Sequence, residues 1–505
     1  MQNRHLYLNL ILILVTIFLS IVSSTAAGNK ISIYPVYPWS LLTDADTISE
    51  IPSLGNSVIL EGFRNEFLVG AAIISADKKS DITITLTGDK YLDSSFNLRI
   101  LGEVQGKTHD GKPVWYPDAL FSNPTGMPDL TGIIRNWDTI RDFPVVHLSP
   151  KKPVAVWITV NTKDIKSEKA TGYISLMKSG KTIAKLPISV IVHPIELPQD
   201  NPIIGYTWTT YKEDTELART IRDYGINACG YYDNWKMLKQ TGFRYFKFNF
   251  NLSNWNPESL KVSDAEIIEN LQPIRDTIRQ LNLKPEEWAI EIFDEPFDAN
   301  AWIYAAWMIR IKRLWKEAQF SANPGYSWTN KNFATIENTI NPLKDYVTCW
   351  CPYIDYLRQP EFIRALKQTR HPIWYYTIEY NHAKPSRGGR QLPWLAWRFQ
   401  LDGWAFYSLK DSGNANPWND NACIRMYPGR TMSIWMEGLR QGVGDYKRLW
   451  YLENHGYTYD ALTAAIISTI PKKTDAPWGG ADPELYQLMR NKLDELILLD
   501  MKKNK

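Results

Sequence analysis

Cysteine is scarce in this chain, which has only four in 505 residues. Four thiols are too few for a disulfide framework. Cys349 and Cys351 are two positions apart in an apolar run, so they would share one face of a strand and could not easily form a bridge. No CxxC or His-x-His cluster accompanies them, and the seven histidines are scattered. We therefore expect buried thiols and no metal site.

An excess of charge of one sign is also missing. The formal net charge is only +3, so no basic field argues for nucleic acid as a partner. Neither GxGxxG nor GxxxxGK[ST] occurs, which leaves a nucleotide site without support. Hydrophobic residues make up 44% and charged residues 22% of the chain, as in an ordinary globular protein. We expect no cofactor.

Long hydrophobic runs are absent except at the start of the chain. Arg4 precedes an apolar core over 6–22, and small residues follow at 24–27. This pattern predicts an export signal over residues 1–27, although the core is long enough for an uncleaved membrane anchor to stay an alternative. We expect an exported protein, periplasmic or extracellular, with no stable membrane insertion once the signal is removed.

The first half of the remaining chain has an all-β pattern. Strand-length segments rich in β-branched residues lie at 57–60, 67–74, 82–86, 154–160 and 186–192. Gly, Asp and Lys fall between them, and no long amphipathic helix appears. These features predict a β-sandwich over residues 28–198, followed by a short proline-bounded linker.

After Pro202 the pattern changes to strands that alternate with helices. Strands are expected to begin at Ile203, Gly225, Tyr245, Trp288, Pro324, Tyr346, Pro372 and Gly403. Amphipathic helices are expected at 216–224, 265–281, 301–318, 360–368, 392–401 and 433–452. Eight strand–helix pairs fit a (β/α)8 TIM barrel better than an open doubly wound sheet. We therefore predict a multidomain protein, β then α/β, with a catalytic barrel over 199–456 and a C-terminal helical extension over 457–505.

Two adjacent acids, Asp294 and Glu295, follow the fourth predicted barrel strand and precede Pro296. Barrel active sites lie at the C-terminal ends of the strands. Like charges so close favour one protonated and one ionised carboxyl group, which is the division needed to cleave a glycosidic bond. Strict alternation would point the two side chains to opposite faces, so the backbone must leave strand geometry at Phe293 or Asp294. The competing interpretation is a surface turn.

Aromatic residues are abundant, with 21 Trp and 27 Tyr. Several lie near predicted strand ends, where flat apolar rings with polar tips suit sugars. The candidate substrate-binding residues are Trp208, Tyr232, Asn249, Trp328, Tyr376, Glu379, Trp404 and Trp418. Core packing explains any single one of the aromatic candidates equally well.

The chain resembles glycoside hydrolase family 123, the β-N-acetylgalactosaminidases. The residues that carry the resemblance are Asp294-Glu295-Pro296, the run 402–407 with Asn416-Pro417-Trp418-Asn419-Asp420, Tyr427-Pro428-Gly429 and the helix motif 433–446. The family also places a β-sandwich before the barrel. Two departures are Trp435, where relatives usually carry Arg, and the additional acid Glu291.

The resemblance implies a retaining, exo-acting hydrolase of terminal β-linked N-acetylhexosamine, most of all N-acetylgalactosamine. In that mechanism the 2-acetamido oxygen of the substrate attacks the anomeric carbon. Glu295 would then be the general acid and base, and Asp294 would accept the acetamido N–H. Tyr376, on the seventh strand, would donate a hydrogen bond to the acetamido oxygen.

Two alternatives stay open. Glu379, near the end of the seventh strand, could be the nucleophile of a covalent mechanism with Glu295 as the acid/base. A carbohydrate-binding protein without catalysis is the other. The sequence does not decide between galacto and gluco substrates, exo and endo action, or linkages.

Other charged residues have simpler expected roles. Lys384, Arg387 and Arg390 are expected in a basic loop, which either reads an anionic sugar or is merely solvated. The remaining charged residues of the terminal motifs are expected to hold the barrel together through buried ion pairs; they are Asp402, Glu437, Arg440 and Asp445.

Overall fold

The computed structural model describes residues 30–503, except for 42–43, 90–94, 108–111, 166–167, 210–213, 231–233, 253–255, 328–331, 334, 379–385, 411–417, 419–424 and 471–482. The predicted export signal therefore lies outside the described residues. Within the described part, no helix combines the length and the hydropathy needed to cross a bilayer.

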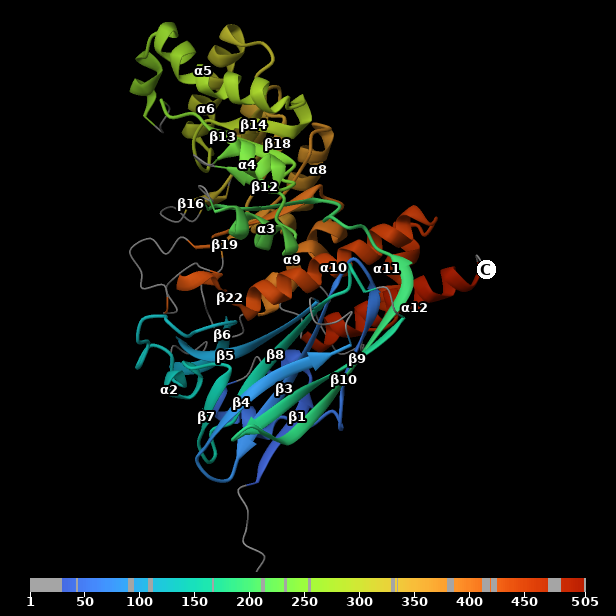
Figure 1. The fold of residues 1–505 in the computed structure, drawn as a ribbon. Coiled ribbons are helices and arrows are strands. Elements are labelled where there is room, and N and C mark those ends of the chain that lie inside the picture. The colour runs from blue at the N-terminus through green and yellow to red at the C-terminus, as the bar shows by residue number, and fades with distance from the viewer. Residues whose placement is uncertain are drawn as a thin grey trace, which may run out of the picture.

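The N-terminal half forms two β-sheets packed face to face (Figure 1). One contains, in spatial order, β1 (Ile31–Val36), β3 (Phe67–Ala76), β8 (Val154–Asn161), β5 (Phe96–Lys107) and β6 (Pro113–Phe121). The other contains β2 (Val58–Arg64), β10 (Lys181–Glu196), β9 (Lys169–Lys178), β4 (Ser80–Gly88) and β7 (Val145–Leu148). Alternate residues of both sheets share one apolar core. The predicted strands of this half are confirmed, and its described part also contains two short 3-10 helices, at Pro38–Leu41 and Ala45–Glu50, and the short α2 (Trp137–Ile140).

A segment from far later in the chain completes the first sheet. β22 (Thr431–Ser433) pairs antiparallel with β6, and β21 (Met426–Tyr427) pairs with β22. The sequence pattern predicts these residues within the barrel region 199–456 and not in the sandwich, because a strand of two or three residues has no periodicity of its own. The two halves of the protein are therefore joined through a shared sheet.

The second half contains parallel strands separated by helices. One sheet has the order β12 (Ala228–Gly230), β13 (Tyr245–Asn249), β14 (Trp288–Glu291), β15 (Phe320–Ala322) and β18 (Cys349–Trp350). A second has the order β11 (Ile204–Thr207), β20 (Gly403–Tyr407) and β19 (Tyr376–Ile378). Parallel bridges link Trp350 to Ile373 and Tyr353 to Tyr376, between β18 and β19. The other edges of the two sheets are formed by β12 and β11. Here the Asn227 N–H, just before β12, donates a hydrogen bond to the Gly205 carbonyl of β11 at 2.9 Å.

Helices follow these strands. They are α3 (Thr215–Asp223), α4 (Trp235–Gln240), α5 (Asp264–Leu281), α6 (Ala299–Leu314), α7 (Asn341–Leu343), α8 (Pro360–Gln368) and α9 (Ser386–Arg398), with the short hairpin β16 (Tyr326–Ser327) and β17 (Asn332–Phe333) after β15. The predicted helices at 216–224, 265–281 and 360–368 agree with these bounds to within a residue. The helix predicted at 301–318 ends four residues earlier, at Leu314, and the one predicted at 392–401 lies instead at Ser386–Arg398. The fifth strand, expected from Pro324, instead ends at Ala322, since proline has no N–H for the ladder.

The expected basic loop is corrected in part. Helix α9 begins at Ser386, so Arg387 and Arg390 belong to a helix. Arg390 is buried, and its Nε donates to Asp445 Oδ2 at 2.8 Å. An anion-binding role for Arg390 is therefore wrong, because its guanidinium already neutralises a buried carboxylate. Lys384 lies outside the described residues.

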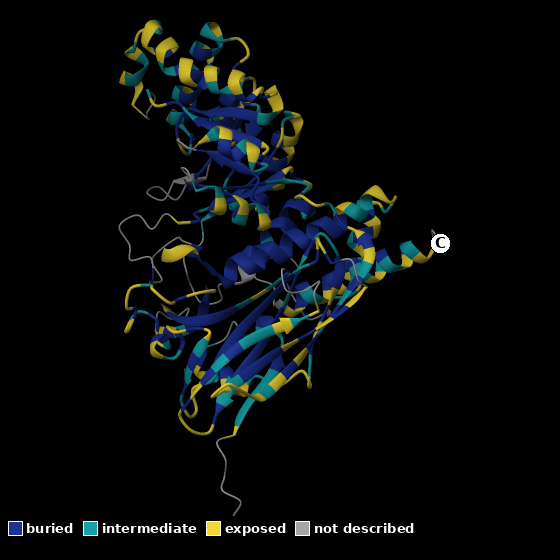
Figure 2. Cartoon of the chain, viewed as in Figure 1, coloured by how far each residue is buried: buried dark blue, intermediate teal, exposed yellow. Residues whose placement is uncertain are grey.

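Helix α10 (Ile434–Asn454) lies between the two halves and is buried along most of its length (Figures 1 and 2). Glu437 pairs with Arg99 of β5 at 2.6 Å and with Arg440, and Asp445 pairs with both Arg390 and Arg490. The prediction that Glu437, Arg440 and Asp445 form buried ion pairs is confirmed. The Glu437–Arg99 pair joins the two halves of the protein, whereas Asp445 pairs with residues of the second half. Asp402 instead accepts a hydrogen bond from the Ile373 N–H at 2.9 Å.

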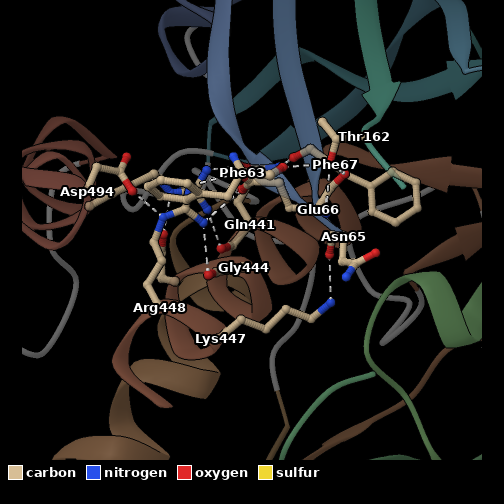
Figure 3. A network of polar contacts seen from close by, with 12 residues as sticks. Phe63, Asn65, Glu66, Phe67, Thr162, Gln441, Gly444, Lys447, Arg448 and Asp494 are labelled. Atoms are coloured by element: carbon tan, nitrogen blue, oxygen red, sulfur yellow. Dashed lines mark hydrogen bonds and ion pairs between the residues drawn. The ribbon is translucent and has the colours of Figure 1, made fainter. Parts of the chain in front are cut away.

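The chain ends with two helices, α11 (Tyr459–Ile467) and α12 (Pro483–Lys503). Arg448 connects α10 with the sandwich and with α12. Its guanidinium donates to Glu66 at 2.8 and 3.0 Å and to Asp494 of α12 at 2.5 Å (Figure 3). The neighbouring Lys447 donates to the carbonyls of Asn65 and Gln199. These contacts fix the orientation of the strand–helix half on the sandwich.

Candidate active site

Inward-facing side chains of the parallel strands pack together in one group, which we call the inner cluster. It consists of Tyr206, Trp208, Ala228, Tyr245, Ala289, Cys349, Cys351, Trp374, Tyr376 and Ala405. Along β14, Ala289 joins this cluster, whereas Trp288 and Ile290 pack with the helices. This alternation follows from the two-residue period of a strand. The cluster defines the inside of the parallel-strand assembly.

The acid pair lies just beyond the carboxyl end of β14. The strand ends at Glu291, the chain bends at Phe293 and Asp294, and Glu295 has the left-handed value of φ +49°. The predicted departure from strand geometry is therefore confirmed. A positive φ is unfavourable for a residue with a side chain and is found disproportionately at functional sites.

Asn323, which follows β15, contacts both acids. Its Nδ2 donates a hydrogen bond to Asp294 Oδ1, and its Oδ1 accepts the Glu295 N–H at 3.3 Å. Asn323 is buried, Glu295 is half-buried and Asp294 is exposed. One buried amide thus holds the adjacent acids at the same strand edge.

The Glu295 carboxyl group reaches across to β19. The Tyr376 hydroxyl donates a hydrogen bond to Glu295 Oε1. A Cβ atom at Gly325 would overlap the Glu295 side chain, so only glycine leaves room for the carboxyl group in this position. Burial raises the pKa of Glu295 to about 7, with the Tyr376 hydrogen bond lowering it and the nearby Asp294 charge raising it. A carboxyl group with this pKa can give and take a proton near neutral pH.

A buried ion pair lies next to these acids. Lys247 Nζ of β13 is 2.5 Å from Glu291 Oε1, and both side chains are at most 5% exposed. Lys247 Nζ also lies 4.8 and 5.0 Å from the ring centroids of Trp208 and Tyr206. Burial raises the pKa of Glu291 to about 7, against the opposing charge of Lys247, and Asp294 raises it further. The additional acid of β14 therefore has a cationic partner, as a buried charge requires.

Three of the predicted substrate-binding residues lie around this site. Tyr376 and Trp208 belong to the inner cluster, with ring centroids 5.6 Å apart. Asn249 ends β13 directly opposite Glu291 in the strand register. Its buried Oδ1 accepts no hydrogen bond from any described residue.

The structure corrects two other predictions. Trp404 faces the helices, where it packs on Phe406, because Ala405 takes the inward position of β20. Trp418 belongs to the sandwich core and stacks on Tyr427 with ring centroids 5.0 Å apart. Tyr232, Trp328 and Glu379 lie outside the described residues, so their roles stay predictions.

Sequence reasoning missed Lys247, Asn323 and Gly325. A charged residue within the apolar strand Tyr245-Phe246-Lys247-Phe248 could have revealed Lys247, since an inward lysine needs an acidic partner. Asn323 and Gly325 flank Pro324, where the sequence pattern predicts the beginning of the fifth strand, so neither is expected at the carboxyl end of a strand. Across the described parts of the chain, no three His, Cys, Asp or Glu side chains gather as a metal site would require.

Comparison with known proteins agrees with this architecture. No family model and no curated protein matches the chain. Among solved structures, it is similar to a family 123 glycoside hydrolase from Clostridium perfringens, with a TM-score of 0.63 and 11% identity over 94% of this chain and 98% of the other. It is also similar to a family 39 glycoside hydrolase from the gut symbiont Bacteroides cellulosilyticus WH2, with a TM-score of 0.34 and 10% identity over 69% of this chain and 77% of the other. The first similarity confirms the predicted resemblance to family 123 at the level of the fold.

Proposed function

We propose that the parallel strands form a (β/α)8 barrel and that the protein is a glycoside hydrolase with its active site at the carboxyl ends of these strands. The strand order, the bridges between β18 and β19 and the Asn227–Gly205 hydrogen bond support closure of the barrel. The similarity in fold to a family 123 glycoside hydrolase supports the reaction class. The N-terminal residues support export of the mature enzyme.

The proposed substrate is a glycan with a terminal β-linked N-acetylhexosamine, N-acetylgalactosamine above all, cleaved with retention of configuration. In the first step protonated Glu295 gives its proton to the glycosidic oxygen as the bond from this oxygen to the anomeric carbon breaks. The acetamido oxygen of the same sugar forms a bond to that carbon. Asp294 accepts the acetamido N–H and stabilises the positive charge of the oxazolinium intermediate.

In the second step Glu295, now ionised, takes a proton from water. The resulting hydroxide equivalent attacks the anomeric carbon, and the bond to the acetamido oxygen breaks. Two displacements at one carbon retain its configuration. Only one protein group transfers protons, so an adjacent acid pair suffices.

The observation that carries the proposal is the combination of a Glu295 pKa of about 7 with Asp294 held beside it by Asn323. A protonated acid next to an exposed carboxylate supplies the proton and the negative charge that the reaction needs. In the free protein the Tyr376 hydroxyl binds Glu295. Its predicted contact with the acetamido oxygen would require a change of partner on substrate binding.

The test measures hydrolysis of aryl β-N-acetylgalactosaminide, β-N-acetylglucosaminide and β-galactoside by the wild type and by Asp294→Asn and Glu295→Gln. We expect activity on an N-acetylhexosaminide and losses of about 10²- to 10⁴-fold in each variant. Glu286→Gln, at an exposed position before β14, is the matched control. Near-normal rates in both site variants, or hydrolysis of the galactoside alone, would overturn substrate assistance.

A second measurement separates the two chemical mechanisms. A thiazoline that mimics the oxazoline should inhibit a substrate-assisted enzyme strongly. Covalent trapping of a 2-fluoro sugar on Glu379 would instead establish the covalent mechanism. Glycan binding without turnover of any substrate would support the alternative that this is a carbohydrate-binding protein without catalytic activity.

A further inference from the structure

A cavity lies between the sandwich and the strand–helix half. It is a cleft of about 580 Å³, whose walls come from one face of β5, β6 and β8, from helix α3 and from residues 429–432. Figure 1 shows α3 at the border of the strand–helix half that faces β22 and β6. The volume is within the usual range of ligand-binding sites.

Two walls of this cleft come from segments that follow the carboxyl ends of parallel strands, as the acid pair does. Helix α3 follows β11, and the segment 429–432 follows β20, each on the carboxyl side of its strand. Asp294 and Glu295 lie on the carboxyl side of β14, and the carboxyl ends of parallel strands point in one direction. Arg430, in the segment 429–432, connects this wall with α3 through ion pairs of 2.8 Å to Asp214 and Glu216 at the beginning of the helix.

The sandwich wall presents polar groups that have no side-chain hydrogen-bond partner among the described residues. Asn97, Ser122 and Asn123 line the cleft with exposed side chains. None of the three forms a side-chain hydrogen bond with the described part of the chain.

The arginines that line the cleft already pair with carboxylates. Arg430 pairs with the acids of α3, and Arg99 and Arg440 both pair with the buried Glu437. On the sandwich wall a ligand therefore meets uncharged amides and a hydroxyl. Such neutral hydrogen-bonding groups suit a neutral sugar better than a phosphate, a sulfate or nucleic acid.

We propose that this cleft binds the part of the glycan on the leaving-group side of the cleaved bond, so that the sandwich selects oligosaccharides over simple glycosides. The inference rests on the proposed function. It assigns the sandwich a direct role in substrate binding, beyond its role as a support for the strand–helix half. The ligand class is an uncharged oligosaccharide ending in N-acetylhexosamine.

The test compares kcat/KM for a tetrasaccharide with a terminal β-N-acetylgalactosamine and for the aryl β-N-acetylgalactosaminide. The variants are Asn97→Ala/Asn123→Ala, which removes two amides, and Ser122→Trp, which fills the cleft. We expect the ratio of the two values to fall about three- to tenfold in the first, as for the loss of one or two neutral hydrogen bonds, and further in the second. Thr87→Ala, exposed on β4 of the other sheet, should leave the ratio unchanged.

A ratio that stays at the wild-type value in both cleft variants would overturn the inference while leaving the proposed function intact. If the wild type hydrolyses neither compound, the proposed function fails, and the cleft is tested by calorimetric titration with the same tetrasaccharide. Binding by the wild type that Ser122→Trp abolishes would support the cleft as a glycan site. Equal binding by both proteins, or no binding by either, would exclude it.

Discussion

The Tyr376 hydroxyl donates a hydrogen bond to Glu295 Oε1, joining two residues that are 81 positions apart. The Tyr376 ring is held between Trp208 and Tyr353, with ring centroids 5.6 and 5.3 Å away. The position of the hydroxyl is therefore set by packing within the inner cluster. The proposed acid is thus oriented from across the strand assembly, while its neighbour Asp294 is oriented by Asn323.

This relationship predicts the pH dependence of activity. Glu295 must be protonated to donate, so kcat/KM should fall as the pH rises through about 7. Tyr376→Phe removes the hydrogen bond that lowers the pKa of Glu295, so the descending limb should move to higher pH, by about 0.5–1 unit. The pH profiles of wild type and variant measure the shift, and an unmoved limb would show that Glu295 is not the titrating acid.

Gly325 should be essential for the position of the acid. Its substitution by alanine places a methyl group where the Glu295 side chain lies. We expect kcat of Gly325→Ala to fall by about tenfold or more, because a displaced acid no longer reaches the glycosidic oxygen. Circular dichroism should show an intact fold.

The Lys247–Glu291 pair should contribute to stability in a pH-dependent manner. Lys247→Met leaves a buried carboxyl group without its cation, so the pKa of Glu291 should rise above its wild-type value of about 7. Below that pH the folded wild type and the folded variant both hold Glu291 protonated, so the destabilisation of the variant should be small. It should grow as the pH rises above about 7, by up to about 1.4 kcal/mol per pH unit.

Urea unfolding of Lys247→Met at several pH values measures this effect. The double variant Lys247→Met/Glu291→Gln removes both charges and should recover part of the loss at pH 8. A destabilisation of Lys247→Met that is independent of pH would indicate lost packing against Trp208 and Tyr206 instead of an uncompensated carboxylate.

The two halves of the protein should unfold together. Arg448 is fully buried and pairs with Glu66 of the sandwich and Asp494 of α12. Arg448→Met leaves both acids without this partner, so we expect about 3–5 kcal/mol of destabilisation in a single cooperative transition. Arg64→Met, which breaks the exposed Arg64–Glu196 pair, should change stability by less than about 1 kcal/mol. Two separate urea transitions in the wild type would contradict the coupling.

Much of the fold could be predicted because its signals are local. The β-branched runs of the sandwich and the amphipathic helices, such as 264–281, have the period of their own secondary structure. Strands β21 and β22 could not be predicted, because two or three residues are too few to show a period. Their place in the sheet depends on the pairing of β22 with β6, which lies about 300 residues earlier in the sequence. The candidate aromatics were predicted only as a group, because a ring near a strand end can point to either side.

The amino-acid sequence by itself determined the succession of a β half and a strand–helix half, and it placed Asp294 and Glu295 where a strand ends. Periodicity, turn residues and adjacency along the chain are sufficient for that. Tertiary structure alone decided that Glu295 meets Tyr376 and Gly325, that Glu291 meets Lys247, and that Trp404 faces the helices. These outcomes depend on strand register and on contacts between distant residues, which set the burial and the charge around each carboxyl group.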